Sequence, residues 1–122
     1  MTATRQLVER YLQGWNETDP LRRRALIEDI YAEYAAYVDP MVEARGKEAI
    51  DATIAAVQGV FPGHVFTLAG EVDAHHDIAR FQWHLAKPGE DEPLVIGFDV
   101  VVLDAGRIGQ VHGFLDKVPV AA

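Results

Sequence analysis

Apolar residues recur every three to four positions through the first half of the chain, a spacing that is typical of helices packed on one side. The stripe of the first predicted helix consists of Ala3, Leu7, Val8, Tyr11, Leu12 and Trp15. Asp19-Pro20 supplies a cap and a first-turn proline for a second helix. Its expected inner face consists of Leu21, Ile27, Ile30, Tyr31 and Tyr34. A third helix is predicted between Gly46 and Gly59, with Pro62-Gly63 after it and with Ile50, Thr53, Ile54 and Val57 buried.

From His64 onward the apolar period changes to two, which indicates β-strands. Strands are predicted over residues 64–74, 78–86, 94–103 and 107–116, joined by segments rich in turn formers. Two shorter strands, at 35–39 and 42–45, are predicted to form a hairpin around Pro40-Met41. Helices followed by a run of antiparallel strands indicate an α+β domain with the helices on one face of a curved sheet. Such a sheet can leave a pocket between itself and the helices.

Length and charge narrow the class of protein further. A chain of 122 residues with 49% hydrophobic content is long enough for one domain with a real core, so we expect a single domain over residues 1–122. The formal net charge of −8 argues against nucleic-acid and anionic-membrane partners and favours a neutral or cationic small molecule. There is no apolar run of about 18 residues and no signal-peptide pattern, so we expect a soluble, cytoplasmic protein.

The sequence contains no motif typical of a cofactor or metal site. It holds no cysteine, phosphate loop, nucleotide fingerprint, serine elbow or zinc-ligand pattern, so we expect neither a cofactor nor a metal site. The one local cluster of basic charge, Arg22-Arg23-Arg24, lies within a predicted helix and is interpreted as a solvated helix face.

Asp99 lies inside an otherwise apolar run, from Val95 to Leu103, that is typical of a strand covered on both faces. Burial raises the pKa of an unpaired carboxyl group because the loss of hydration destabilises its charged form. A carboxylic acid kept neutral in this way can donate a hydrogen bond. Tyr11 lies on the first apolar stripe and Asp39 at the end of a hairpin strand. Together with Asp99, these two residues predict a proton-transfer site. The alternatives are structural: Asp99 paired with Arg80 or another strand neighbour, and Tyr11 as a core residue.

The predicted order of elements, three helices around a β-hairpin and then four long strands, resembles the nuclear transport factor 2-like (NTF2-like) superfamily. This superfamily includes the SnoaL-like polyketide cyclases and the ketosteroid isomerases. Val8-Glu9-Arg10-Tyr11-Leu12, followed by Asn16 and Asp19, resembles the first isomerase helix with its oxyanion-binding tyrosine. Tyr37-Val38-Asp39-Pro40 resembles the segment of the general base, and Phe98-Asp99-Val100 that of the protonated aspartic acid.

The resemblance implies a cone-shaped fold and a cofactor-independent isomerase or cyclase acting on a carbonyl compound. Asp39 would remove a proton next to the carbonyl group, and Tyr11 and Asp99 would hold the developing enolate oxygen. Two features depart from the isomerase pattern. The segment between Tyr11 and Asp39 is longer, and the supporting tyrosine of the third helix corresponds to Ile54. Gly97-x-Asp99, Gly106-Arg107-Ile108 and Gly113-Phe114-Leu115-Asp116 are closer to the uncharacterised SnoaL-like proteins.

A second group of residues is expected to bind the substrate. If the strand over 78–86 turns Arg80, Gln82 and His84 toward the same side as Asp99, one wall of the pocket is polar. Trp15 and Trp83 are expected in the core or pocket wall, and His112 in the pocket or at a dimer interface. His84 has a pKa suited to proton transfer near neutrality.

Three functions remain open at this point. The first is the isomerase or cyclase, and the second is a dehydratase or epoxide hydrolase that uses His84 and Arg80 with a carboxylate. The Arg-x-Asp spacing of the hydrolases is absent, because Gly97 stands two residues before Asp99. The third is a non-catalytic ligand-binding or dimerisation module, since a fold alone does not determine chemistry. In each case we expect a homodimer, because Phe98, Val100 and Val102 form an apolar outer face.

Overall fold

The computed structural model describes residues 2–119. Within them lie three helices, α1 (Thr2–Asn16), α2 (Pro20–Ile30) and α3 (Lys47–Val60). The strands are β1 (Tyr31–Asp39), β2 (Val42–Arg45), β3 (Val65–His75), β4 (Ile78–Ala86), β5 (Val95–Asp104) and β6 (Arg107–Lys117). No helix in this part of the chain is long and apolar enough to span a membrane.

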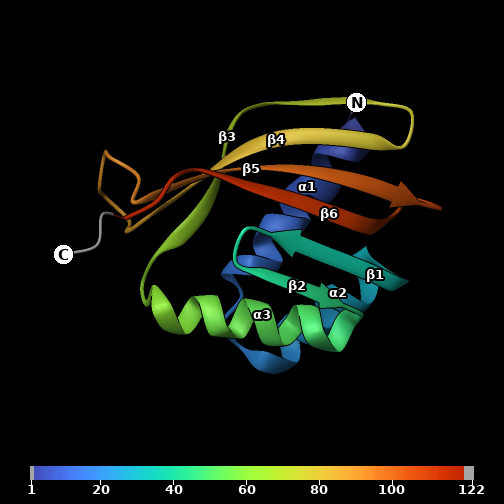
Figure 1. The fold of residues 1–122 in the computed structure, drawn as a ribbon, viewed down its shortest axis with the longest axis horizontal. Coiled ribbons are helices and arrows are strands. Elements are labelled where there is room, and N and C mark those ends of the chain that lie inside the picture. The colour runs from blue at the N-terminus through green and yellow to red at the C-terminus, as the bar shows by residue number, and fades with distance from the viewer. Residues whose placement is uncertain (1, 120–122) are drawn as a thin grey trace.

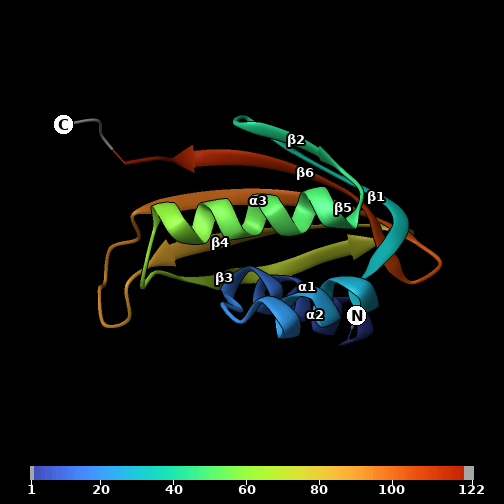
Figure 2. The ribbon, with the colours of Figure 1, turned by 90° about the horizontal axis from the view of Figure 1, so that it is seen from below.

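The strands form one curved sheet in the order β2-β1-β6-β5-β4-β3. The helices gather on one side of it, with α3 running beneath the hairpin β1-β2 and α1 crossing behind the long strands (Figures 1 and 2). The predicted α+β class and the predicted elements are confirmed. The sheet is mostly antiparallel, and its one parallel pair among the described strands is that of β1 with β6. This pairing joins the hairpin to the meander of β3 to β6.

The second helix is shorter than predicted and the following strand longer. The helix ends at Ile30, and Tyr31 has extended backbone angles while its N–H still donates to the carbonyl of Ile27. Tyr31 is buried as a strand residue, whereas Tyr34 is 92% exposed and Leu21 83% exposed, so their assignment to a helical inner face is wrong. The backbone of this segment pairs with β6 and does not continue the helix, and Tyr31 is the register partner of Ile108. Aromatic residues also suit a strand better than a helix.

The interpretation of the basic cluster as a solvated helix face is wrong for Arg23. Its side chain is buried, and its Nε donates to Asp51 of α3 at 2.6 Å. Its Nη1 donates to the side chain of Gln58 and to the carbonyl oxygen of Glu17. Gln58 donates in turn to the carbonyl oxygens of Trp15 and Glu17. This network ties the end of α1 to α2 and α3, because it satisfies carbonyl groups that the helix end leaves free.

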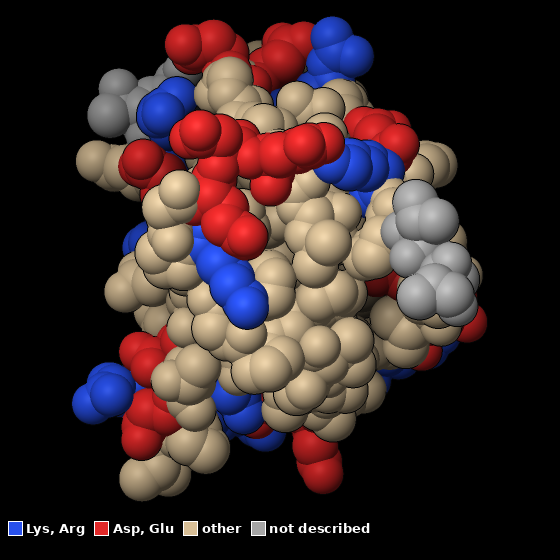
Figure 3. All heavy atoms as spheres, turned by 90° about the vertical axis from the view of Figure 1, so that its left-hand side faces the viewer, with Lys and Arg blue, Asp and Glu red and all other residues tan. Residues whose placement is uncertain are grey.

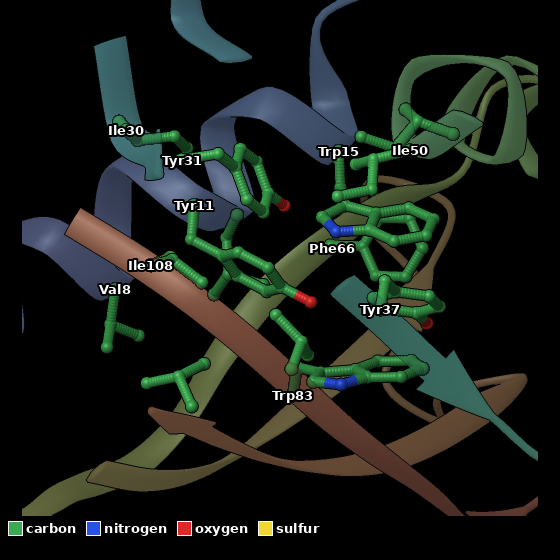
Figure 4. Packing of buried hydrophobic residues seen from close by; sticks show 14 of the residues in the cluster. Val8, Tyr11, Trp15, Ile30, Tyr31, Tyr37, Ile50, Phe66, Trp83 and Ile108 are labelled. Carbon is green, nitrogen blue, oxygen red and sulfur yellow. The ribbon is translucent and has the colours of Figure 1, made fainter. Parts of the chain in front are cut away.

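The core lies between the helices and the inner face of the sheet. Tyr11 and Trp15 of α1 reach toward Trp83 of β4 and Phe66 of β3 (Figure 4). Asn16 fixes this arrangement, because its amide donates to the carbonyl of Phe66 at 2.9 Å and accepts from the Phe66 N–H at 2.8 Å. These two hydrogen bonds fix the position of the end of α1 against β3. Trp15, one residue before Asn16, and Phe66 both line the cavity described below.

Candidate active site

A cavity of about 420 Å³ opens between α1, α3 and the inner face of the sheet. Most of its wall is apolar or aromatic. Its lining residues are Tyr11, Leu12, Trp15, Tyr37, Asp39, Met41, Val42, Ala52, Thr53, Ala56, Val57, Phe61, Phe66, Trp83, Leu85, Val95, Asp99, Leu115 and Val118. Cavities of this size and character are common binding sites for small organic molecules. Tyr11, Asp39 and Asp99 therefore share one cavity, together with Trp15 and Trp83.

Tyr11 and Asp99 form a buried pair in the wall of this cavity. The Tyr11 hydroxyl donates to Oδ2 of Asp99 at 2.8 Å, although 88 positions separate the two residues in the chain. Tyr11 is 2% exposed and Asp99 is 3% exposed. Burial raises the pKa of Tyr11 well above its usual value, and the charge of Asp99 adds to the rise. Tyr11 is therefore a neutral donor at all ordinary pH values.

The environment of Asp99 shifts its protonation toward neutrality. Burial raises the pKa of Asp99 from 3.8 to about 6, and the nearby charge of Asp39 adds to the rise. Hydrogen bonds from the side chains of Tyr11 and Trp83 act in the opposite direction. Since the neutral acid and the carboxylate are both accessible near pH 6, Asp99 can change its protonation state when a ligand binds.

Asp39 has a different environment at the end of β1. The Tyr37 hydroxyl donates to its Oδ2 at 2.6 Å, and the backbone N–H groups of Met41 and Val42 donate to its Oδ1 at 2.8 and 3.0 Å. The carboxylate is thereby fixed in orientation at the cavity wall. A carboxylate has about four acceptor positions, so one remains on Oδ2 after it accepts from Tyr37.

Gly113 of β6 lies between the two carboxyl groups. A Cβ atom placed on it would lie 3.0 Å from Oδ1 of Asp99 and 3.2 Å from Cβ of Asp39. Gly113 is also the register partner of Asp99 across the β5–β6 pair. Because no side chain stands between them, the two carboxyl groups face one another across the backbone of β6. This closeness agrees with the effect of Asp39 on the pKa of Asp99.

Gly97 makes room for the Trp83 indole in the same way. A Cβ on Gly97 would lie 1.9 Å from Cζ2 of Trp83, so the indole ring lies directly over the glycine. Trp83 pairs with Gly97 and Phe81 pairs with Asp99 across the β4–β5 ladder. Residues that are directly opposite in a ladder point to the same face, so Trp83 and Asp99 both point inward.

The same register contradicts the predicted polar wall. Arg80 is paired with Val100, Gln82 with Phe98 and His84 with Ile96, all on the outer face of the sheet. None of these residues lines the cavity. Arg80 instead pairs with Asp73 of β3 at 3.0 Å, and both side chains are more than half exposed. The prediction of an inward direction is wrong because the sequence gives the alternation of faces but not which set faces the core.

His112 also lies on the outer face. It pairs with Val100 of β5 and Val38 of β1, and its Nε2 lies 3.0 Å from the side-chain oxygen of Gln110. His112 therefore lies outside the pocket, and its place at a dimer interface stays a prediction.

Two residues of the site were not singled out from the sequence. Tyr37 stands two positions before Asp39, and residues at this spacing share one face of a strand, so its proximity could have been inferred. The position of Gly113 between the carboxyl groups could not have been inferred, because it depends on the register of three strands. Ile54, the residue at the position of the family's supporting tyrosine, is buried in α3.

The SnoaL-like domain profile matches residues 8–111. A SnoaL-like protein of Agrobacterium tumefaciens, whose isomerase assignment is an inference, is 42% identical with a TM-score of 0.90, covering 96% of this chain and 100% of that one. A SnoaL-like protein of a Jannaschia species, with an inferred assignment as a polyketide cyclase, is 20% identical with a TM-score of 0.76. The alignment covers 94% of this chain and 86% of that one.

A protein of Catenulispora acidiphila with a ketosteroid isomerase-like fold is 18% identical with a TM-score of 0.70, covering 88% of this chain and 82% of that one. Its structure contains trimethylamine, so a relative of this fold binds a small molecule. No curated protein sequence matches the chain. On the match to residues 8–111 and the 42% identity, the chain belongs to the SnoaL-like family of the NTF2-like superfamily.

Proposed function

We propose that the protein is a cofactor-independent isomerase or cyclase that acts on a small carbonyl compound. The observation that carries the proposal is the buried Tyr11–Asp99 pair, which faces Asp39 across Gly113 in an apolar cavity. Burial of such polar groups in an apolar core costs free energy, and buried groups with a shifted pKa are concentrated at functional sites.

The proposed reaction begins with a proton on the carbon next to the carbonyl group. The carboxylate of Asp39 takes this proton, and the C–H electron pair moves into the new carbon–carbon double bond of the enolate. The Tyr11 hydroxyl and the acid form of Asp99 donate hydrogen bonds to the enolate oxygen, where the negative charge develops. Return of the proton from Asp39 to another carbon gives an isomer. Alternatively, the enolate carbon attacks a second carbonyl carbon and closes a ring; the C=O π electrons move to the oxygen, which then takes the proton from Asp39.

The protonation of Asp99 determines whether it helps or hinders this step. An ionised Asp99 would repel an enolate, whereas the neutral acid donates to it. With a pKa of about 6, Asp99 takes up a proton on enolate formation at a modest cost in free energy. Tyr37 supports the base by holding Oδ2 of Asp39 in place.

The relatives support the choice of reaction class. The Agrobacterium protein, at 42% identity, carries an inferred assignment as an isomerase. Trimethylamine in the Catenulispora protein supports a small organic molecule as the ligand of this fold.

Titration with 2-naphthol tests the oxyanion site, because a bound naphtholate imitates the enolate. We expect wild-type protein to bind naphthol and to lower its pKa, as read from its fluorescence, and Asp99→Leu to lose this effect. Asp116→Asn, which changes an exposed carboxylate of β6, is the matched control and should behave as wild type. If the folded wild type binds naphthol without a change in its ionisation, the oxyanion site is refuted.

Hydrogen exchange tests the base. In D2O, a panel of small ketones and enones should exchange the protons next to the carbonyl group with wild-type protein, as followed by NMR. Asp39→Asn should abolish this exchange and leave naphthol binding largely intact. Naphthol binding with no exchange on any ketone would instead favour the non-catalytic binding module.

The second enzymatic candidate has no support in the geometry. It requires His84 and Arg80 beside a carboxylate of the pocket, and both side chains lie on the outer face of the sheet, away from Asp99. We therefore do not propose a dehydratase or an epoxide hydrolase.

We also propose that two copies associate through the outer face of the sheet. Phe98, Val100 and Val102 are only partly buried there, and Phe114 of β6 is 57% exposed. Apolar side chains side by side on one face are typical of an interface. Light scattering tests this proposal, and a monomer at micromolar concentration would refute it.

A further inference from the structure

We propose that the cavity binds a ligand with an alkylated, positively charged nitrogen, held between the carboxyl groups of Asp39 and Asp99 and the aromatic wall beside them. This concerns the chemical class of the ligand. It does not depend on the proposed proton transfer, and it can be tested without turnover.

The charged side chains of the cavity favour a cation. Among the described residues that line it, Asp39 and Asp99 are the only acidic side chains, and none is a lysine, arginine or histidine. The cations of the described chain that form ion pairs do so elsewhere, as Arg80 does with Asp73 and Arg23 with Asp51. Two carboxyl groups in an apolar wall favour a cationic ligand, because a buried carboxylate is stabilised by a charge partner.

The cavity also has an aromatic wall. Tyr37, Trp15, Phe66 and Trp83 follow one another along the cavity, with successive ring centroids 5.5, 5.5 and 5.1 Å apart. Three of these four residues come from different strands, and Trp15 comes from α1, so their tertiary arrangement is specific to the fold (Figure 4). The faces of indole and phenol rings attract cations, and alkylated ammonium groups are bound by such aromatic walls.

The hydrogen-bond acceptors of the two carboxyl groups distinguish between kinds of ammonium group. A primary ammonium has three donors and needs several free acceptors. Here Asp39 already accepts three hydrogen bonds, from Tyr37 and from two backbone N–H groups. The remaining acceptors belong mainly to Asp99, which accepts from Tyr11 and is only 3% exposed, so few of them can be reached by a ligand. A nitrogen that carries alkyl groups needs few acceptors, and its alkyl groups can pack against the apolar remainder of the wall.

The electrostatic surroundings of the cavity are consistent with this choice. Phe61, Val95 and Val118 line the cavity at the end of the molecule where α3 ends and the loop between β4 and β5 lies (Figure 1). That loop contains the exposed acidic residues Glu90, Asp91 and Glu92. Acidic side chains gather over the upper part of this end, above a broad uncharged area (Figure 3). With a chain net charge of −8, the field attracts cations.

The experiment compares two probes of nearly the same shape, phenyltrimethylammonium and tert-butylbenzene, which differ in the charge of one central atom. Binding to the whole protein at pH 8 is measured by tryptophan fluorescence and checked by calorimetry. We expect the ammonium compound to bind at least about tenfold more tightly than the neutral one. Equal affinities, tighter binding of the neutral compound, or no binding of either would overturn the proposal.

Variants separate the cavity from the general negative charge of the protein. Asp99→Asn and Asp39→Asn should each reduce the preference for the ammonium compound several-fold, while affinity for tert-butylbenzene stays the same and shows that the cavity is intact. Asp91→Asn, an equal change of charge in the exposed loop, is the matched control and should keep the preference. If Asp91→Asn reduces it as much as the cavity variants do, the attraction is a property of the surface and the proposal is wrong. Failure of the enolate chemistry would be seen in the naphthol and exchange assays and leaves these probes unaffected.

Discussion

Replacement of Gly97 by alanine is expected to destabilise the protein through a single rigid contact. The added Cβ would lie 1.9, 2.2 and 2.5 Å from Cζ2, Cε2 and Cη2 of Trp83, which are distances that no packed carbon atoms adopt. The indole is a rigid ring in a wall that also contains Phe66, at a centroid distance of 5.1 Å, so it cannot yield by a small rotation. Either the strands separate locally or Trp83 leaves its place over β5.

Overpacking of this kind costs about 1–3 kcal/mol in the free energy of unfolding. For a domain of this size, each kcal/mol lowers the melting temperature by roughly 3–5 °C, so a decrease of roughly 3–15 °C is expected.

The assay is thermal and urea unfolding followed by tryptophan fluorescence and circular dichroism. Gly14→Ala is the matched control, because a Cβ at Gly14 of α1 meets nothing within 4 Å. Alanine in a helix is favoured over glycine by up to about 1 kcal/mol, so this variant should be as stable as wild type or more stable. The reasoning is refuted if Gly97→Ala unfolds at the wild-type temperature with an unchanged tryptophan spectrum.

Three further predictions concern the carboxyl pair and the buried arginine. Because the pKa of Asp99 is raised to about 6 in the folded protein, the folded state binds a proton more tightly than the unfolded state between about pH 4 and 6. Wild-type stability should therefore fall as the pH rises through this window, by up to about 3 kcal/mol, and urea unfolding of Asp99→Asn should lack the decrease. Gly113→Ala places a methyl group 3.0 Å from Oδ1 of Asp99, so naphthol affinity should fall about tenfold; an unchanged dissociation constant would contradict this role of the glycine. Arg23→Met removes the 2.6 Å ion pair with Asp51 and should lower the free energy of unfolding in urea by about 2–4 kcal/mol. The double variant Arg23→Met/Asp51→Leu should recover part of this loss, because it leaves no unpaired carboxylate. A loss of stability below the error of the measurement would show that the network contributes nothing.

The sequence by itself determined much of the local structure. The apolar stripe of α1, the proline and cap before α2 and the alternation in β4 to β6 each depend on neighbours a few positions away, and the structure has these elements where they were predicted. The burial of Asp99 was also predictable, because its neighbours in β5 are apolar on both sides. The presence of Tyr11, Asp39 and Asp99 in one cavity agrees with the hypothesis from the resemblance, and their chemical roles stay predictions.

The tertiary structure decided which residues meet. A strand pattern has a period of two, but a shift of one residue moves every side chain to the other face, so Arg80, Gln82 and His84 could not be placed from β4 alone. The early start of β1 depends on its parallel pairing with β6. The burial of Arg23 and the position of Gly113 likewise depend on partners that are distant in the chain. Periodicity is a local property of the sequence, whereas register and contact follow from how distant elements pack together.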